Sequence, residues 1–108
     1  MLSFESISAF GPNAAIIHYG PQASTAAKIT RDSLYLLDAG AQYLDCTTDV
    51  TRTHVFGVAT EEQKKAYTLV LQGSIDLADA IFPAGTYGRS IDILARQSLY
   101  KNFMDYNH

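Results

Sequence analysis

The spacing of apolar residues changes near the middle of the chain, and this change most constrains the fold. Before residue 60, apolar and β-branched residues form short runs bounded by glycine, proline and asparagine, which is typical of strands joined by turns. Beyond residue 60, apolar residues recur every three or four positions, which is typical of amphipathic helices. The order predicts an α+β fold: an antiparallel hairpin sheet, then two amphipathic helices packed on one face.

The first half contains four strand-like segments. The pattern predicts strands over residues 14–19, 34–37, 41–44 and 47–56. In the last segment, alternation places Asp49 and Thr51 on one face and Val50, Arg52 and His54 on the other. Short turns between these segments favour a sheet built from hairpins.

The second half contains two helical patterns. Thr60 and Gln63 match a capping box, which predicts a helix of about twenty residues ending near Phe82-Pro83. Its predicted apolar face is formed by Tyr67, Val70, Leu71, Ser74, Ile75 and Ala78. A second helix has an apolar face of Ile91, Leu94, Ala95, Ser98 and Leu99. Asp92 and Arg96 are spaced to pair on its solvent side.

Composition excludes several classes of partner. The chain has 108 residues, with 8 basic and 11 acidic side chains and a net charge of −3, which disfavours a nucleic-acid surface. No apolar run approaches the ~20 residues that span a bilayer, and the N-terminus lacks the pattern of a signal peptide. Cys46 is the one cysteine and cannot form an internal disulfide. We therefore expect a cytoplasmic protein with no nucleic-acid or membrane partner.

Two aspartates are the main candidates for chemistry. Asp38 and Asp49 lie eleven residues apart on strands predicted to form one hairpin. If its turn falls near residues 43–45, the two carboxylates become near cross-strand neighbours, where like charges repel. A divalent cation would compensate this repulsion, because hard metals prefer carboxylate oxygen. Exposed strand or turn aspartates are common, however, and the spacing alone leaves both interpretations open.

The other candidates carry weaker signals. His18 ends an apolar run, and histidine titrates near neutral pH, so both a structural and a catalytic role are open. His54 lies on the face opposite Asp49, which favours a structural role, and His108 is the last residue of the sequence. Thr51 shares a face with Asp49 and is placed to orient it, or serves only as a good strand former. Nothing near Cys46 marks it as a nucleophile.

Two segments carry a family resemblance. The string AAIIHYGP and the later string LLDAGAQYLDCTTDVTRT closely resemble the catalytic domain of Xaa-Pro aminopeptidases, also called aminopeptidase P. This family belongs to the pita-bread metallopeptidases, with prolidase, creatinase and methionine aminopeptidase. The resemblance extends over almost the whole chain, from Ser3 to His108.

The resemblance implies a role for each candidate residue. Asp38 resembles the aspartate that chelates one metal, and Asp49 resembles the aspartate that bridges two metals. His18 and His108 resemble two catalytic histidines near the substrate, and Thr51 resembles the residue that supports the bridging aspartate. The implied enzyme uses two divalent metal ions, by resemblance Mn(2+), and cleaves peptides with proline at the second position.

The chain departs from the family pattern in its ligand count. The family uses five metal ligands, of which the sequence holds two, so residues 1–108 resemble the incomplete N-terminal portion of a pita-bread catalytic domain. By itself the chain is expected to bind metal weakly and to lack peptidase activity. Apolar faces left uncovered predict a homo-oligomer, or pairing with the remaining half of the catalytic domain. Two other functions remain open: a non-catalytic pita-bread relative that binds or regulates, and a prolidase-type dipeptidase.

Overall fold

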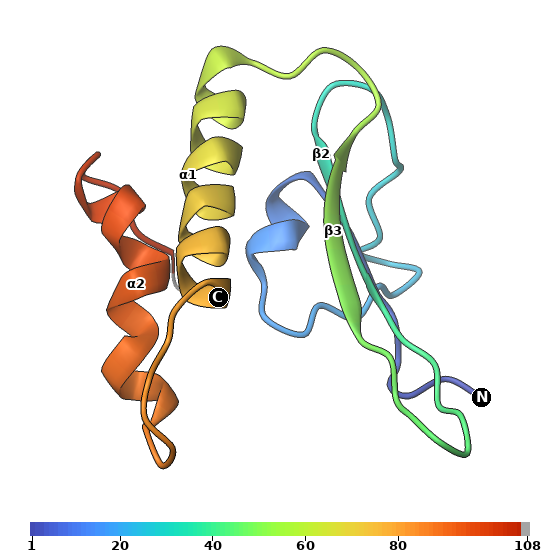
Figure 1. The fold of residues 1–108 in the computed structure, drawn as a ribbon. Helices are drawn as coiled ribbons and strands as arrows, with labels where there is room; N and C mark the ends of the chain where they lie inside the picture. Colours follow the sequence, from blue (N-terminus) through green and yellow to red (C-terminus); the bar gives the residue numbers. More distant parts are fainter. Residues whose placement is uncertain (107–108) are drawn as a thin grey trace. The chain divides into compact units, whose positions relative to one another are not determined.

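The computed structural model describes residues 1–106, and Figure 1 shows a sheet built from the first half and helices built from the second. The chain divides into two compact units, Met1–Ala59 and a second that begins at Thr60. We call them the sheet unit and the helical unit. The predicted α+β fold is confirmed, while the packing of helices on one face of the sheet stays a prediction. Within the described residues, no helix is both long and apolar enough to cross a membrane.

The sheet unit contains three antiparallel strands in the order β1-β2-β3. They are β1 (Ile7–Phe10), β2 (Leu34–Ala39) and β3 (Val50–Val55). The predicted strand over residues 34–37 is confirmed and continues to Ala39, and the one over residues 47–56 is confirmed over Val50–Val55. Residues 41–44 contribute only isolated bridges, in which Ala41 pairs with Leu2 and Gln42 with Thr47.

The predicted strand over residues 14–19 is wrong. The chain instead forms β1 earlier, turns at Gly11 with φ of 60°, and enters the 3-10 helix η1 (Gly11–Ala15) with Pro12 in its first turn. A short apolar run does not distinguish a strand from other buried segments. Here the run supplies Ala14 and Tyr19, which pack against Ile7 and Ala9 in the core of this unit.

Helix α1 (Glu61–Ala78) begins as the sequence predicts. The Thr60 hydroxyl accepts a hydrogen bond from the Gln63 backbone N–H, and the Gln63 side chain accepts one from the Thr60 N–H. The helix ends earlier than predicted, because Asp79 already caps it with a hydrogen bond from its N–H to the Ile75 carbonyl. Phe82-Pro83 therefore lies in the connection that follows and does not end the helix.

Helix α2 (Gly88–Tyr100) packs against α1 through small residues. A Cβ on Gly73 would lie 2.0 Å from the Ala95 carbonyl oxygen, so the two backbones approach closely at this point. The predicted apolar face of α2 is confirmed, since all five of its members are buried or half-buried. Arg96, predicted on the solvent side, is half-buried as well. On α1, helix α2 covers a different face from the predicted apolar one: Leu69 and Gly73 are buried, whereas Tyr67 and Ile75 are 53% and 56% exposed.

Candidate metal centre

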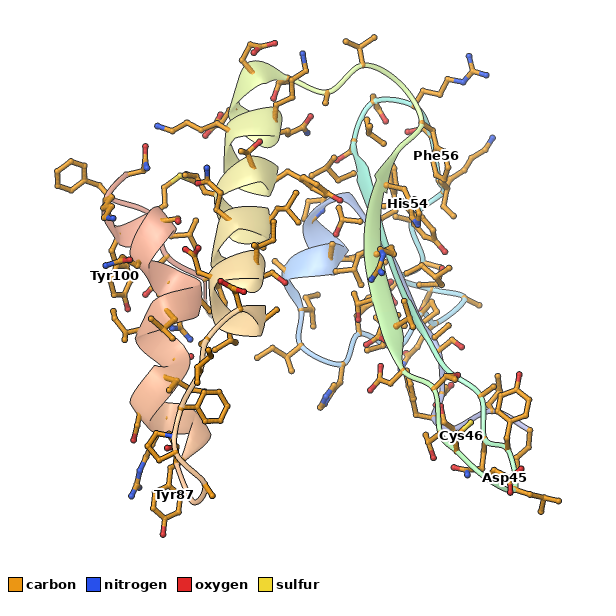
Figure 2. The ribbon with its side chains drawn as sticks, in the orientation of Figure 1. Asp45, Cys46, His54, Phe56, Tyr87 and Tyr100 are labelled. Atoms are coloured by element: carbon orange, nitrogen blue, oxygen red, sulfur yellow. The ribbon has the colours of Figure 1, made fainter. Side chains whose placement is uncertain are left out.

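The β2–β3 hairpin places the two candidate aspartates on one face. Asp38 pairs with Thr51 across the ladder, and Asp49 lies two residues before Thr51, on the same side of β3. The register continues to the turn, where the Tyr43 N–H donates to the Cys46 carbonyl at 2.9 Å. Figure 2 shows Asp45 and Cys46 at this tip of the hairpin. The two carboxylates are thus diagonal neighbours, whose Cβ atoms in such ladders are about 7–8 Å apart or somewhat less.

A glycine between the aspartates allows a third segment to approach. A Cβ on Gly40 would lie 2.1 Å from the Thr48 carbonyl oxygen and 2.3 Å from Ser3 Oγ. The Ser3 N–H donates to the Gly40 carbonyl at 3.2 Å, and Ser3 Oγ donates to the Thr48 carbonyl at 3.0 Å. Any larger residue at position 40 would push the N-terminal segment or the second strand away. In the sequence, Gly40 only separates the strand-like runs 34–37 and 41–44, and the pattern carries no signal for this close approach.

Asp38 carries an unusual atom. Its Oδ1 is buried and is the one such side-chain oxygen or nitrogen in the described residues without a hydrogen-bond partner. Burying a polar atom without a partner costs free energy, and most native proteins avoid it. A cation bound at this oxygen would compensate the cost. The Asp38 carboxylate therefore fits a hard divalent metal ion.

Asp49 and Thr51 complete this face of the hairpin. Both side chains are exposed, so they are accessible to further ligands or to a partner segment. Over residues 1–106, no group of three or more histidine, cysteine, aspartate or glutamate side chains is placed to hold a metal ion. The predicted support of Asp49 by Thr51 stays a prediction.

His18 lies in a turn rather than at the end of a strand. Its φ of 53° is in the left-handed region, which costs a residue other than glycine about 1–2 kcal/mol. The turn is closed by the Tyr19 N–H, which donates to the Ile16 carbonyl at 3.2 Å. Tyr19 is buried, and its hydroxyl accepts from Asn13 Nδ2 at 3.0 Å, so it anchors the strained position of the exposed His18.

The structure does not bring all the candidates together. Within residues 1–106, no hydrogen bond or ion pair joins His18 to either aspartate, and His108 lies outside the described residues. His54 lies on the other face of the sheet, where its ring stacks 6.3 Å from Tyr35 and 6.4 Å from Phe56. Figure 2 shows His54 and Phe56 far along β3 from the hairpin tip. The structural role favoured for His54 agrees with this placement.

A comparison with protein families supports a metal-binding role for the β2–β3 hairpin. The model of metallopeptidase family M24 matches residues 1–108. The chain belongs to metallopeptidase family M24. The predicted resemblance to Xaa-Pro aminopeptidases is confirmed, and the strands and helices form part of the pita-bread fold.

Three M24 relatives illustrate the similarity. Aminopeptidase P1 of Lotus japonicus is 55% identical over 107 residues, which are 99% of this chain and 16% of that protein. An X-prolyl aminopeptidase from Caenorhabditis elegans, described as cytosolic with a di-nuclear active site, matches 99% of this chain with a TM-score of 0.90 and 46% identity, over 18% of its own length. A prolidase from Thermococcus sibiricus matches 94% of this chain and 27% of its own, with a TM-score of 0.81 and 35% identity. The chain thus spans about a sixth to a quarter of the length of these relatives.

Proposed function

We propose that this M24 chain is the N-terminal portion of the catalytic domain of a metal-dependent Xaa-Pro aminopeptidase. The observation that carries the proposal is the buried, unpartnered Oδ1 of Asp38, on the hairpin face that also presents Asp49. The similarity to X-prolyl aminopeptidases over nearly the whole chain supports it. In this proposal residues 1–108 supply two of the ligands, and the remaining half of the domain supplies the others.

The substrate class explains why such a site is needed. An Xaa-Pro bond is a tertiary amide without an N–H, and proline fixes its own φ, so ordinary backbone recognition fails there. Bound divalent ions would polarise the scissile carbonyl and lower the pKa of water. Asp38 and Asp49 would hold these ions, while the carboxylate oxygens favour a hard cation such as Mn(2+).

In this proposal His18 and His108 contact the substrate and not the metal ions. The Tyr19 anchor holds His18 in one backbone conformation, which reduces the reorganisation needed when substrate binds. A neutral imidazole donates one hydrogen bond and accepts another, so His18 and His108 are suited to orient a peptide and to stabilise charge at the scissile carbonyl. We propose a cytoplasmic location from the single free Cys46 and the cytosolic relative.

The small number of buried apolar side chains indicates that the chain associates with a partner. The described residues bury only five apolar side chains: Ile7, Ala9, Tyr19, Leu69 and Leu99. Many large apolar side chains, such as Leu71 and Val50, are about half exposed. Exposed apolar surface of this kind promotes association. We therefore propose that the 108-residue chain forms a homo-oligomer unless it pairs with the rest of the catalytic domain.

Metal binding and turnover test the proposal in one series. The chain, joined to or mixed with the rest of a catalytic domain, is loaded with Mn(2+) and assayed by elemental analysis and by release of the first residue from an Xaa-Pro tripeptide. Asp38→Asn and Asp49→Asn should lose metal and lower turnover by at least about 100-fold. Asp45→Asn, at the exposed hairpin tip, is the matched control and should change neither.

The outcomes separate the possible functions. Metal-dependent cleavage of the tripeptide that Asp38→Asn abolishes supports the aminopeptidase. Cleavage of Xaa-Pro dipeptides alone would replace it with a prolidase-type dipeptidase. Full metal occupancy in Asp38→Asn, or metal binding by wild-type protein without any turnover, would contradict the proposed enzyme and favour a binding protein of the same fold.

A further inference from the structure

The hydrogen-bond ladder of the β2–β3 hairpin is irregular between its two aspartates. The register sets Ala41 opposite Thr48, and two residues paired in this way normally exchange both backbone N–H···O bonds. The Thr48 N–H does donate to the Ala41 carbonyl at 2.9 Å. The Ala41 N–H, however, donates to the Thr48 hydroxyl at 2.9 Å and not to the Thr48 carbonyl. The Thr48 carbonyl is therefore turned away from the ladder.

This carbonyl accepts its hydrogen bond from Ser3 instead. Ser3 Oγ donates to the Thr48 carbonyl at 3.0 Å, and the Ser3 N–H donates to the Gly40 carbonyl at 3.2 Å. The contact fills the space beside Gly40, where a Cβ would lie 2.3 Å from Ser3 Oγ. A single residue thus joins the segment that follows β2 to the segment that precedes β3.

The backbone around Ser3 fixes the position of its hydroxyl. Leu2 forms an antiparallel bridge with Ala41, and the Met1 carbonyl accepts from the Gln42 N–H at 2.9 Å. Residues 1–3 therefore lie along the segment that follows β2. Since this pairing uses backbone groups alone, the Ser3 side chain remains available for the Thr48 carbonyl.

Both carbonyls bound by Ser3 are close in sequence to the candidate metal ligands. The Thr48 carbonyl and the Asp49 N–H belong to one planar peptide unit, so the bond from Ser3 fixes the plane from which Asp49 starts. Asp49 lies just before β3 and outside its ladder with β2. The register sets Gly40 opposite Asp49, so no cross-strand side chain supports this aspartate. The Gly40 carbonyl lies two residues beyond Asp38 on the other strand.

We propose that Ser3 is a positioning residue, which holds the backbone of Asp49 in place relative to Asp38 so that both carboxylates serve one metal centre. The inference rests on the proposed function, in which these two aspartates hold divalent ions. A site binds metal more tightly when its ligands are held in the binding geometry before the ion arrives. Ser3 acts through the peptide between Thr48 and Asp49 and is not itself a ligand.

The first test measures metal affinity and needs no activity. Mn(2+) alone is titrated into the 108-residue chain up to millimolar concentration, and the free ion is measured by electron paramagnetic resonance. Ser3→Ala should raise the Kd by about tenfold, whereas Ser3→Thr, which keeps the hydroxyl, should bind close to wild type. Ser8→Ala is the matched control. Ser8 Oγ lies 2.9 Å from the Tyr35 hydroxyl, on the sheet face opposite Asp38, so the Kd should not change.

The second test examines the contact in the metal-free chain. The amide signal of Asp49 in a nitrogen–proton NMR spectrum should move in Ser3→Ala, because the carbonyl of the same peptide unit loses its donor. The signal should stay in place in Ser8→Ala. Each alanine variant loses one side-chain hydrogen bond, so their melting temperatures should fall by similar amounts. A difference in Kd between them therefore does not come from general stability.

The outcomes separate this inference from the proposed function. Weaker Mn(2+) binding in Ser3→Ala, but not in Ser8→Ala or Ser3→Thr, supports the positioning role. If Ser3→Ala binds like wild type while Asp38→Asn binds more weakly, the positioning role is overturned and the proposed function stands.

Three further results would also overturn the inference. Equal weakening in Ser8→Ala would show a general loss of stability, and equal weakening in Ser3→Thr would show that the hydroxyl is not responsible. An unmoved Asp49 amide signal in Ser3→Ala would exclude the contact itself. If Asp38→Asn binds Mn(2+) as tightly as wild type, the proposed metal site fails and the positioning role fails with it.

Discussion

The helical unit and the sheet unit differ in whether their charged side chains have partners. All three ion pairs found in residues 1–106 lie in the helical unit: Lys64 with Glu61, and Arg96 with Asp92 and Asp105. The sheet unit instead contains Asp38, whose buried oxygen has no partner among the described residues. The helical unit uses its charges to hold its own structure. The sheet unit keeps a carboxylate free at the cost of stability, which is typical of a ligand-binding site.

This difference predicts that single substitutions change the free energy of unfolding in opposite directions in the two units. Substitutions that disturb packing or pairing in the helical unit should destabilise it. Removing the unpartnered charge of the sheet unit should stabilise the metal-free chain. The four predictions below test this contrast, beginning with the largest effect.

The helix contact at Gly73 should be the most sensitive position of the helical unit. Gly73→Ala places a Cβ 2.0 Å from the Ala95 carbonyl oxygen, so α1 and α2 must separate. We expect a loss of about 1–3 kcal/mol in unfolding free energy, larger than the gain in helix propensity of about 1 kcal/mol. Gly88→Ala is the control, because no atom lies within 4 Å of a Cβ built there. Chemical denaturation followed by circular dichroism measures both, and equal stability of the two variants would contradict the close contact.

Asp38→Asn should have the opposite sign in the sheet unit. The substitution keeps the shape of the side chain and removes the charge of the carboxylate to which the buried, unpartnered oxygen belongs. We expect the metal-free chain to gain up to about 1 kcal/mol. Thermal melts with and without Mn(2+), at concentrations high enough to fill a weak site, check this: wild type should gain stability from the metal, whereas Asp38→Asn should not. A metal-free Asp38→Asn chain that melts below wild type would show that the carboxylate has a structural role.

Features that depend on local sequence patterns could be predicted from the sequence. Strand β2 with Asp38, strand β3 directly after Asp49, the capping box at Thr60 and the apolar face of α2 all follow local rules of alternation, capping and period, and the structure confirms them. Local rules do not choose between two apolar faces of one helix. On α1 the buried face is the one with Gly73, because a close approach to Ala95 requires the smallest residue and not the most apolar face.

The remaining differences also come from tertiary contacts. The apolar run before Gly20 covers a core instead of extending a strand, since Tyr19 packs on Ile7 and Ala9. The contacts of Arg96 with residues 105 and 106 depend on a reversal of the chain that no helical spacing encodes. The Asp38–Asp49 pair could be predicted as a pair, but its diagonal arrangement follows from the register of the whole hairpin.

Phe103→Gly should stabilise the helical unit by a smaller amount. Phe103 is fully exposed and has φ of 56°, so glycine would relieve the left-handed conformation without loss of packing. Part of this gain is offset by the greater freedom of glycine in the unfolded chain, which leaves about 0.5–1 kcal/mol. Tyr100→Ala, which removes a half-exposed ring from the same turn, gives a comparison that should not be stabilising. A lower melting temperature for Phe103→Gly would show that the phenyl ring contributes more to stability than the left-handed backbone costs.

The smallest expected effect is the pH dependence of stability that comes from Asp105, which accepts a hydrogen bond from Arg96. The hydrogen bond from Arg96, followed by that from the Tyr106 N–H, holds the pKa of Asp105 below its ordinary value of 3.8. Because the folded-state pKa is lowered, this carboxylate stabilises the fold above its unfolded pKa, and the contribution is lost as the pH falls through the folded pKa. Wild type should therefore be more stable than Asp105→Asn at about pH 5, and the difference should shrink as the pH drops to about 2.5. Asp76→Asn, an exposed position on α1, should show no such convergence. A stability difference between wild type and Asp105→Asn that stays constant over this range would mean that the charge of Asp105 does not help to hold residues 105 and 106 against α2. Arg96 would then hold them only through its contacts with the Tyr106 carbonyl and ring.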